Sequence, residues 1–214
     1  MAAYPIMLNL AGRLAVVVGG GTVGRRKVDG LLACGARVRV VDPALTGDWP
    51  AGVEQVALAY EARHLHDARL VFACTDNPRI NARVSADAQA GGAWVNVADD
   101  PGAGDFTLPA VHRWEGIIVA VGTVAGTPAL AMAVRDALVQ ALPAGAESFA
   151  LALAGLREKL RAAEPDRHRR HRILRRIGGP EGMLAFQQGG LPAMEQLMTE
   201  DVPSPRDSTP ADGG

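Results

Sequence analysis

The stretch from residue 14 to residue 42, LAVVVGGGTVGRRKVDGLLACGARVRVVD, constrains the fold of this chain more than any other. Residues 14–18 form an apolar run of the kind that a buried parallel strand uses. The glycine-rich segment 19–24 follows at once, and a helical stretch and a second apolar run at 38–41 come next. A strand, a tight turn, a helix and a strand in this order predict the first unit of a Rossmann-type parallel sheet.

The spacing G-x-G-x-x-G in this context is typical of a turn that holds the pyrophosphate of a dinucleotide. One glycine permits the tight turn, a second lets the backbone approach the phosphates, and a third lets the helix pack closely on the sheet. The helix also directs free N–H groups and the positive end of its dipole at the phosphates. The predicted dinucleotide-binding residues are Gly19, Gly20, Gly21, Thr22, Val23 and Gly24. The alternative is a glycine-rich turn in another kind of α/β protein.

Asp42 ends the second apolar run. An acid about 20 residues beyond the glycine loop accepts hydrogen bonds from the adenosine ribose. Its negative charge would repel the 2′-phosphate of NADP, so the sequence favours NAD as the cofactor. Arg25 and Arg26 weaken this preference, because a guanidinium group is a good phosphate ligand.

The composition indicates a globular protein with no overall attraction for polyanions. The chain has 214 residues, 48% of them hydrophobic, and a formal net charge of −1, so we expect no binding to nucleic acid or membranes. Cys34 and Cys74 lie in apolar segments and are expected to be free thiols in a reducing compartment. With no signal-peptide pattern and no apolar stretch of membrane-spanning length, the sequence predicts a cytoplasmic protein.

Strand and helix patterns continue to alternate as far as residue 97, which predicts an α/β fold with a parallel sheet covered on both faces. The rhythm then changes to a hairpin with strands at 106–111 and 117–122 and a polar turn at 112–116 that includes His112, followed by a helix at 128–142. Beyond residue 145 the chain becomes helical and charged. We therefore place the domain boundaries at 1–112, 113–144 and 145–200, with a disordered tail at 201–214.

The loops that follow strands in an open parallel sheet face the bound ligand. Besides the glycine loop, such loops contain Thr75 and Asp76, which we expect to contact the cofactor, and residues 96–101. Asp99 and Asp100 are the acid–base candidates, because a carboxylate there can take a proton while a nicotinamide takes a hydride. The alternative is a plain surface turn, since Asp-Asp-Pro-Gly is good turn chemistry without any function.

The remaining charged residues indicate surface rather than chemistry. His64 and His66 are spaced as a metal-binding pair on a strand would be, but their segment reads as helix or loop, so a solvated pair is favoured. No Cys/His cluster has zinc-site spacing, and we predict no metal site. Residues 167–176 hold six arginines and two histidines. A solvated helix face is the first interpretation, a patch for an anionic small molecule or a partner subunit the second, and nucleic-acid binding the third.

Four segments together resemble the precorrin-2 dehydrogenase family, which comprises the amino-terminal module of siroheme synthase and its stand-alone relatives. They are YPIMLNLAGRLAVVVGGGTVGRRKVDGLLACGARVRVV, ACTDNPRIN, VNVADDPGAGDFTLPA and IIVAVGTVAGTPALA, in the family's order. The resemblance implies NAD-dependent dehydrogenation of precorrin-2 to sirohydrochlorin in siroheme biosynthesis. Some members are also ferrochelatases that insert Fe²⁺ to give siroheme, and the sequence leaves that second activity open.

The resemblance also implies roles for particular residues. In the family's Asn-Val-x-Asp segment the catalytic aspartate corresponds to Asp99, and the cofactor-binding positions correspond to residues 19–23, Asp42 and Pro43. Family members are homodimers, so the resemblance implies a homodimer with residues 113–144 as its dimerisation region, and a tetrapyrrole as the small-molecule partner.

In one loop the chain departs from the family pattern. The family's Ser/Thr-Gly-Gly turn is replaced at residues 122–128 by GTVAGTP, where Val124 and Ala125 adopt positive φ less freely than glycine, so the resemblance does not establish a phosphoryl or substrate contact there. Two alternative functions remain: a dehydrogenase of the same fold with another substrate, and a non-catalytic NAD- or tetrapyrrole-binding module.

Overall fold

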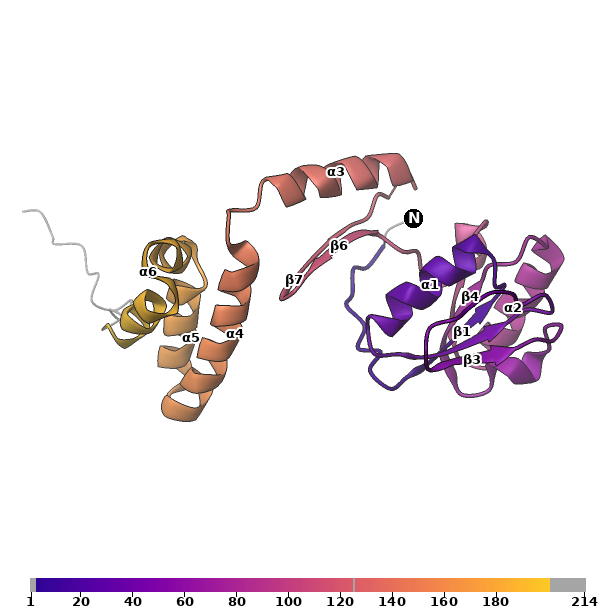
Figure 1. Cartoon of the computed structure of the whole chain (residues 1–214), viewed down its shortest axis with the longest axis horizontal. Coiled ribbons are helices and arrows are strands. Elements are labelled where there is room, and N and C mark those ends of the chain that lie inside the picture. The colour runs from indigo at the N-terminus through magenta and orange to yellow at the C-terminus, as the bar shows by residue number, and fades with distance from the viewer. Residues whose placement is uncertain (1–2, 125, 201–214) are drawn as a thin grey trace, which may run out of the picture. The chain divides into compact units, whose positions relative to one another are not determined.

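The computed structural model describes residues 3–124 and 126–200, and the chain divides into two compact units, 1–108 and 109–214 (Figure 1). The tail at 201–214, predicted to be disordered, lies outside the described residues, as does Ala125 in the loop that departs from the family pattern. Within the part of the chain that the structure describes, no helix is both long and apolar enough to cross a bilayer.

The first unit contains a five-stranded sheet in the order β3-β2-β1-β4-β5, and every neighbouring pair is parallel. Its elements are β1 (Leu14–Val18), α1 (Thr22–Leu32), β2 (Arg37–Val41), β3 (Val53–Val56), β4 (Ala68–Ala73), α2 (Pro78–Ala90) and β5 (Trp94–Val97). The strand order reverses between β1 and β4, and ligands bind at the carboxyl ends of the strands beside such a reversal. The predicted Rossmann-type α/β sheet is confirmed.

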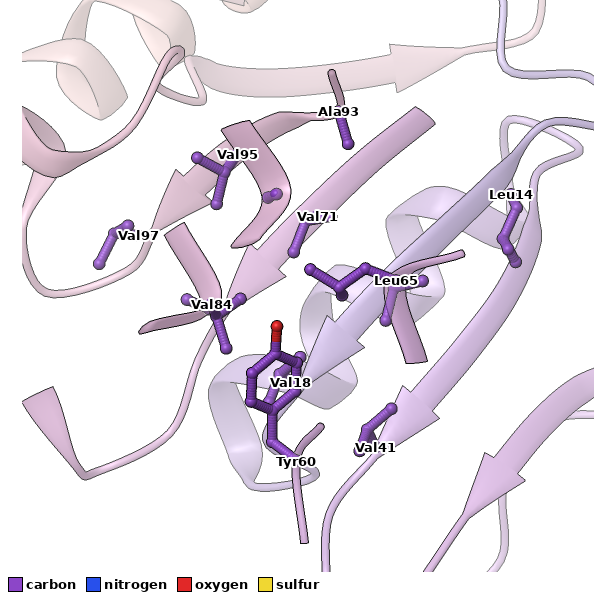
Figure 2. Close-up of a cluster of buried hydrophobic side chains, with 13 residues drawn as sticks. Leu14, Val18, Val41, Tyr60, Leu65, Val71, Val84, Ala93, Val95 and Val97 are labelled. Carbon is purple, nitrogen blue, oxygen red and sulfur yellow. The ribbon is translucent and has the colours of Figure 1, made fainter. Parts of the chain in front are cut away.

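Alternate residues of β1 divide the core between the two faces of this sheet. Val18 belongs to the face that α2 covers with Val84, and Figure 2 shows this cluster. Val17 belongs to the opposite face, which α1 covers with Val28. Every residue of β1 is buried, as a central strand between two helical layers requires.

The second unit combines a hairpin with a series of helices, so the predicted small α+β region and helical C-terminal region are confirmed. Its described elements are β6 (Ala110–Trp114), β7 (Ile117–Val121), α3 (Pro128–Gln140), α4 (Ala146–Ala163), α5 (Arg167–Ile177) and α6 (Pro180–Thr199). The helices α4, α5 and α6 share a core in which Leu156, Ile177 and Met194 are fully buried. The arginine-rich segment forms α5, which buries Ile173 and Ile177 in that core.

The hairpin differs from the prediction in the bounds of its first strand and its turn. His112, which was predicted to lie in the turn, lies within β6, and the turn is the two-residue segment 115–116. Gly116 has a φ of +84°, which glycine adopts without strain in a two-residue hairpin turn. Phe106, predicted to start the strand, instead packs edge-on against Phe72 of the parallel sheet, with ring centroids 5.6 Å apart.

His64 is buried, so the predicted solvated histidine pair is wrong for this residue. It lies in a short 3₁₀ turn, Ala62–Leu65, and only 8% of its surface is exposed. Its Nδ1 accepts a hydrogen bond from the backbone N–H of Glu61 at 3.1 Å. Leu65 packs into the core cluster on the α2 side of the sheet, and docking this turn buries the neighbouring histidine as well. The side chain of His66 is exposed.

We expect the free energy of unfolding to fall as the pH drops below about 6.5, the pKa of an unperturbed histidine. Burial lowers the pKa of His64, so the unfolded chain binds the proton first and the folded state loses stability as the pH falls. Urea unfolding at several pH values measures this slope. His64→Asn keeps an acceptor for the Glu61 N–H and should reduce the slope, whereas His66→Asn should not. An unchanged slope in His64→Asn would contradict the assignment.

Candidate functional site

The glycine loop joins β1 to α1 and leaves the start of that helix open. Gly19 has a φ of +107°, and a methyl group there would lie 2.5 Å from the carbonyl oxygen of Cys74. A methyl group at Gly24 would overlap the carbonyl oxygen of Gly19, whereas one at Gly21 would meet nothing within 4 Å. Among the described residues, no side chain caps α1 at Gly21, so the first N–H groups of the helix are free to bind an anion.

Asp42 connects the end of β2 to the glycine loop. One carboxylate oxygen accepts a hydrogen bond from the N–H of Gly20 at 2.6 Å, and the other accepts one from the N–H of Ala44 at 2.7 Å. Pro43, which stands between Asp42 and Ala44 in the chain, is exposed. The predicted ribose-binding acid is therefore held beside the predicted phosphate loop.

The loop at 43–50 packs on the glycine loop and holds Arg25. The Arg25 guanidinium lies 4.0 Å above the centre of the Trp49 ring and donates hydrogen bonds to the carbonyl oxygens of Thr46 and Asp48, the latter at 3.0 Å. The ring also approaches Gly20, where a methyl group would lie 3.3 Å from it. The sequence suggests Arg25 only as a residue that weakens the preference for NAD, and it gives no role to Trp49. The sequence signal that could have identified Trp49 is its position as an aromatic residue in the loop that follows the second strand.

Thr75 follows β4 and is held by Asn81, a residue of α2 that sequence reasoning also missed. The Asn81 Oδ1 accepts hydrogen bonds from the Thr75 N–H at 3.1 Å and from the Thr75 hydroxyl at 2.7 Å. The Asn81 Nδ2 donates to the Thr75 carbonyl oxygen at 3.0 Å. Asp76, the other predicted contact in this loop, is exposed in the turn before α2.

The two candidate aspartates after β5 have different surroundings. Asp99 is exposed, and its Oδ1 accepts a hydrogen bond from Asn81 Nδ2 at 3.1 Å, so it belongs to the same network as Thr75. Asp100 instead caps the short turn Pro101–Ala103, where its Oδ1 accepts a hydrogen bond from the N–H of Gly102 at 3.0 Å. Asp100 therefore stabilises a turn, and Asp99 is the carboxylate that faces the loop after β4.

Two titratable groups that interact with each other, Cys74 after β4 and Lys27 on α1, have shifted pKa values. Burial raises the pKa of the Cys74 thiol to about 11, so this free cysteine stays protonated at neutral pH and is a poor nucleophile. Burial also lowers the pKa of the Lys27 ammonium, whose charge acts on Cys74 and opposes the rise. No group of three or more His, Cys, Asp or Glu side chains that could hold a metal ion occurs within residues 3–124 and 126–200.

These loops all lie at the carboxyl edge of the parallel sheet, on both sides of the β1–β4 reversal. On the β1–β2 side are Gly19, Gly20, Gly21, Thr22, Val23, Gly24, Asp42 and Pro43; on the β4–β5 side are Thr75, Asp76 and Asp99. The two sides meet where Gly19 packs on the carbonyl group of Cys74. An open helix N-terminus and a carboxylate on one edge suit a reaction that needs both a nucleotide cofactor and a base.

Comparisons with known proteins identify similar sequences and one similar fold. Residues 6–110 match a family model described as putative NAD(P)-binding. The chain is 35% identical over 207 residues to the siroheme synthase of Pseudomonas entomophila strain L48, covering 93% of this chain and 45% of that protein. It is 34% identical over 215 residues to the siroheme synthase of Methylococcus capsulatus strain Bath, covering 98% of this chain and 45% of that protein. The chain thus spans just under half the length of these relatives.

A solved structure shows the same fold. The structure of SirC, precorrin-2 dehydrogenase, matches with a TM-score of 0.75 and 22% sequence identity, and the match covers 92% of this chain and 98% of that one. The likeness therefore extends beyond the parallel sheet to the hairpin and the helices that follow it.

We expect Gly21→Ala to weaken NAD binding while leaving the fold intact. The φ of −68° at Gly21 suits alanine and the added methyl group meets no protein atom within 4 Å, but it occupies the open space where a pyrophosphate would approach the backbone. Titration with NADH, followed by its fluorescence, should show a loss in affinity of about tenfold or more, which corresponds to about 1.4 kcal/mol.

Gly30→Ala is the matched control for this prediction. Gly30 lies inside α1, and a methyl group there also meets nothing within 4 Å. This variant should gain up to about 1 kcal/mol in free energy of unfolding, because alanine favours a helix, and should bind NADH as the wild type does. Equal affinities of the two variants would contradict a dinucleotide site at the glycine loop.

Proposed function

Because this chain belongs to the same family as the siroheme synthases, we propose that it dehydrogenates precorrin-2 to sirohydrochlorin with NAD as the hydride acceptor. The observation that carries the proposal is the position of Asp99, whose carboxylate is tied through Asn81 to the loop beside the glycine loop. A base and a dinucleotide on the same sheet edge are what this dehydrogenation requires.

The reaction removes a hydride and a proton from the macrocycle. NAD, when bound, supplies the hydride acceptor. Asp99 takes the proton, because one of its oxygens is held by the Asn81 amide while its exposed position keeps the other available. Asp100 cannot substitute readily, because its carboxylate caps the turn at Gly102.

We propose NAD rather than NADP on electrostatic grounds. Asp42 follows β2 beside the glycine loop, where its charge would repel a 2′-phosphate on the adenosine ribose. Arg25 does not offset this repulsion, since its guanidinium is held on Trp49 and on the carbonyl groups of the loop at 43–50. Opening these contacts to bind a phosphate would cost their combined free energy.

We propose that two copies of the chain associate through α3. Four of its larger apolar side chains are between 39% and 52% exposed; they are Leu130, Met132, Val134 and Leu138. An exposed apolar surface along a whole helix is typical of a protein–protein interface. This surface supports the dimerisation role that the family resemblance implies for residues 113–144.

Asp99→Asn should lose precorrin-2 oxidation, with a fall in rate of about 10²–10⁴-fold, because the amide cannot accept the proton. Absorbance of the NADH formed measures the rate, and the reaction should be slower with NADP than with NAD. Asp100→Asn is the matched control and should retain turnover, since asparagine also caps a turn. Wild-type turnover by Asp99→Asn would exclude the assigned role.

The same assay separates the alternative functions. A non-catalytic binding module, or a dehydrogenase with another substrate, would form no NADH from precorrin-2, and only the latter would reduce NAD with a different substrate. Adding Fe²⁺ as a substrate together with sirohydrochlorin, and following the absorbance spectrum of the macrocycle, tests iron insertion on the same protein.

A double variant of α3, Leu130→Glu with Leu138→Glu, should convert the protein from a dimer to a monomer. The charges would have to be buried without partners in the proposed interface. Light scattering should give twice the chain mass of 22.3 kDa for the wild type and the single mass for the variant. Leu184→Glu, at an exposed leucine of α6, is the control and should remain a dimer. A monomeric wild type would contradict the proposal.

A further inference from the structure

We infer that Asn81 is a positioning residue of the reaction: its amide holds the Asp99 carboxylate in a set position relative to the glycine loop. The inference rests on the proposed function and extends it to a residue on α2. It follows from the contacts of one side chain that is only 1% exposed.

The Asn81 amide uses its whole hydrogen-bonding capacity. Its Oδ1 accepts two hydrogen bonds, both from Thr75, and its Nδ2 donates two, to the Thr75 carbonyl oxygen at 3.0 Å and to Asp99 Oδ1 at 3.1 Å. The Thr75 N–H can only donate, so the amide oxygen must face it. Turning the amide over would place its oxygen against the Asp99 carboxylate. The orientation of the donor toward Asp99 is therefore determined by Thr75.

Through Thr75 and the backbone, Asn81 connects Asp99 to the glycine loop. Thr75 directly follows Cys74, whose carbonyl oxygen would lie 2.5 Å from a methyl group at Gly19. The glycine loop, the loop after β4 and the loop after β5 thus form a continuous series of contacts in which Asn81 is the only side chain bonded to both Thr75 and Asp99 among the described residues. The base and the cofactor loop then keep a constant spacing, which proton and hydride removal from one macrocycle requires.

A purely structural role does not account for this pattern. The start of α2 is already capped by Asn77, whose side chain accepts from the N–H of Arg79 at 3.0 Å. One turn beyond Asn81, Ser85 shows what a buried polar residue of this helix does for the fold alone: its hydroxyl donates to the carbonyl oxygen of Ala103 at 2.6 Å. Within the described part of the chain Ser85 has no hydrogen bond to Thr75 or Asp99, and it is therefore the matched control.

The test compares Asn81→Asp with Ser85→Ala in the intact chain. The N81D variant keeps the acceptor for the Thr75 N–H and hydroxyl but replaces Nδ2, which donates to both Asp99 and the Thr75 carbonyl oxygen, with a carboxylate oxygen. We expect kcat for precorrin-2 oxidation to fall by about ten- to a hundredfold in N81D, the size of effect that a misplaced reacting group produces. The dissociation constant for NADH should stay within about twofold, and S85A should keep the wild-type kcat. A kcat for N81D equal to that of S85A, or an equal loss in kcat and NADH affinity, would overturn the inference.

A stability cycle tests the same contact without relying on turnover. Adding Asp99→Asn to N81D replaces two facing carboxylates with an amide and a carboxylate, so the melting temperature should rise relative to N81D alone. Adding Asp99→Asn to S85A should give no such rise. If N81D folds poorly, the double variant still reports the contact, and the absence of any rise would overturn the inference. A wild type that forms no NADH from precorrin-2 would instead refute the proposed function and leave this cycle intact.

Discussion

The first unit depends on the close crossing of α1 over β1. The helix backbone at Gly24 approaches the carbonyl oxygen of Gly19 so closely that no side chain fits between them. The same crossing buries Val28 against Val17 and brings the start of the helix to the carboxyl edge of the sheet. Apolar packing therefore fixes the position of the free N–H groups at the start of α1, and these groups can bind an anion.

Two polar side chains then arrange the loops around this helix start. Asp42 and Asn81 lie on opposite sides of the β1–β4 reversal, and each bonds backbone groups of a loop that follows a strand. A polar group that leaves water is stable only when its hydrogen bonds are satisfied, so such groups specify loop conformations more sharply than apolar contacts do. The hydrogen bonds that fix these loop conformations are therefore also the ones that shape the candidate site.

How well each element could be predicted followed the range of the interactions that form it. The strands and helices of the parallel sheet were predictable because the apolar period lies within each segment. The hairpin was shifted because Phe106 finds its partner, Phe72, in the other sheet. The burial of His64 was not predicted, because it depends on the packing of the neighbouring Leu65 into the core. Asn81 was overlooked because an asparagine within a helical segment looks like surface until its partners are known.

The sequence by itself determined the glycine loop, the acid at the end of the second strand and the alternation of strands and helices that builds the parallel sheet, because each depends on residues close together in the chain. Only the tertiary structure decided that Asp99 is linked through Asn81 to the loop after β4 while Asp100 caps a turn, and that Arg25 is held by Trp49. These distinctions depend on contacts between side chains that the fold brings together from separate segments, and no spacing along the chain encodes those distances.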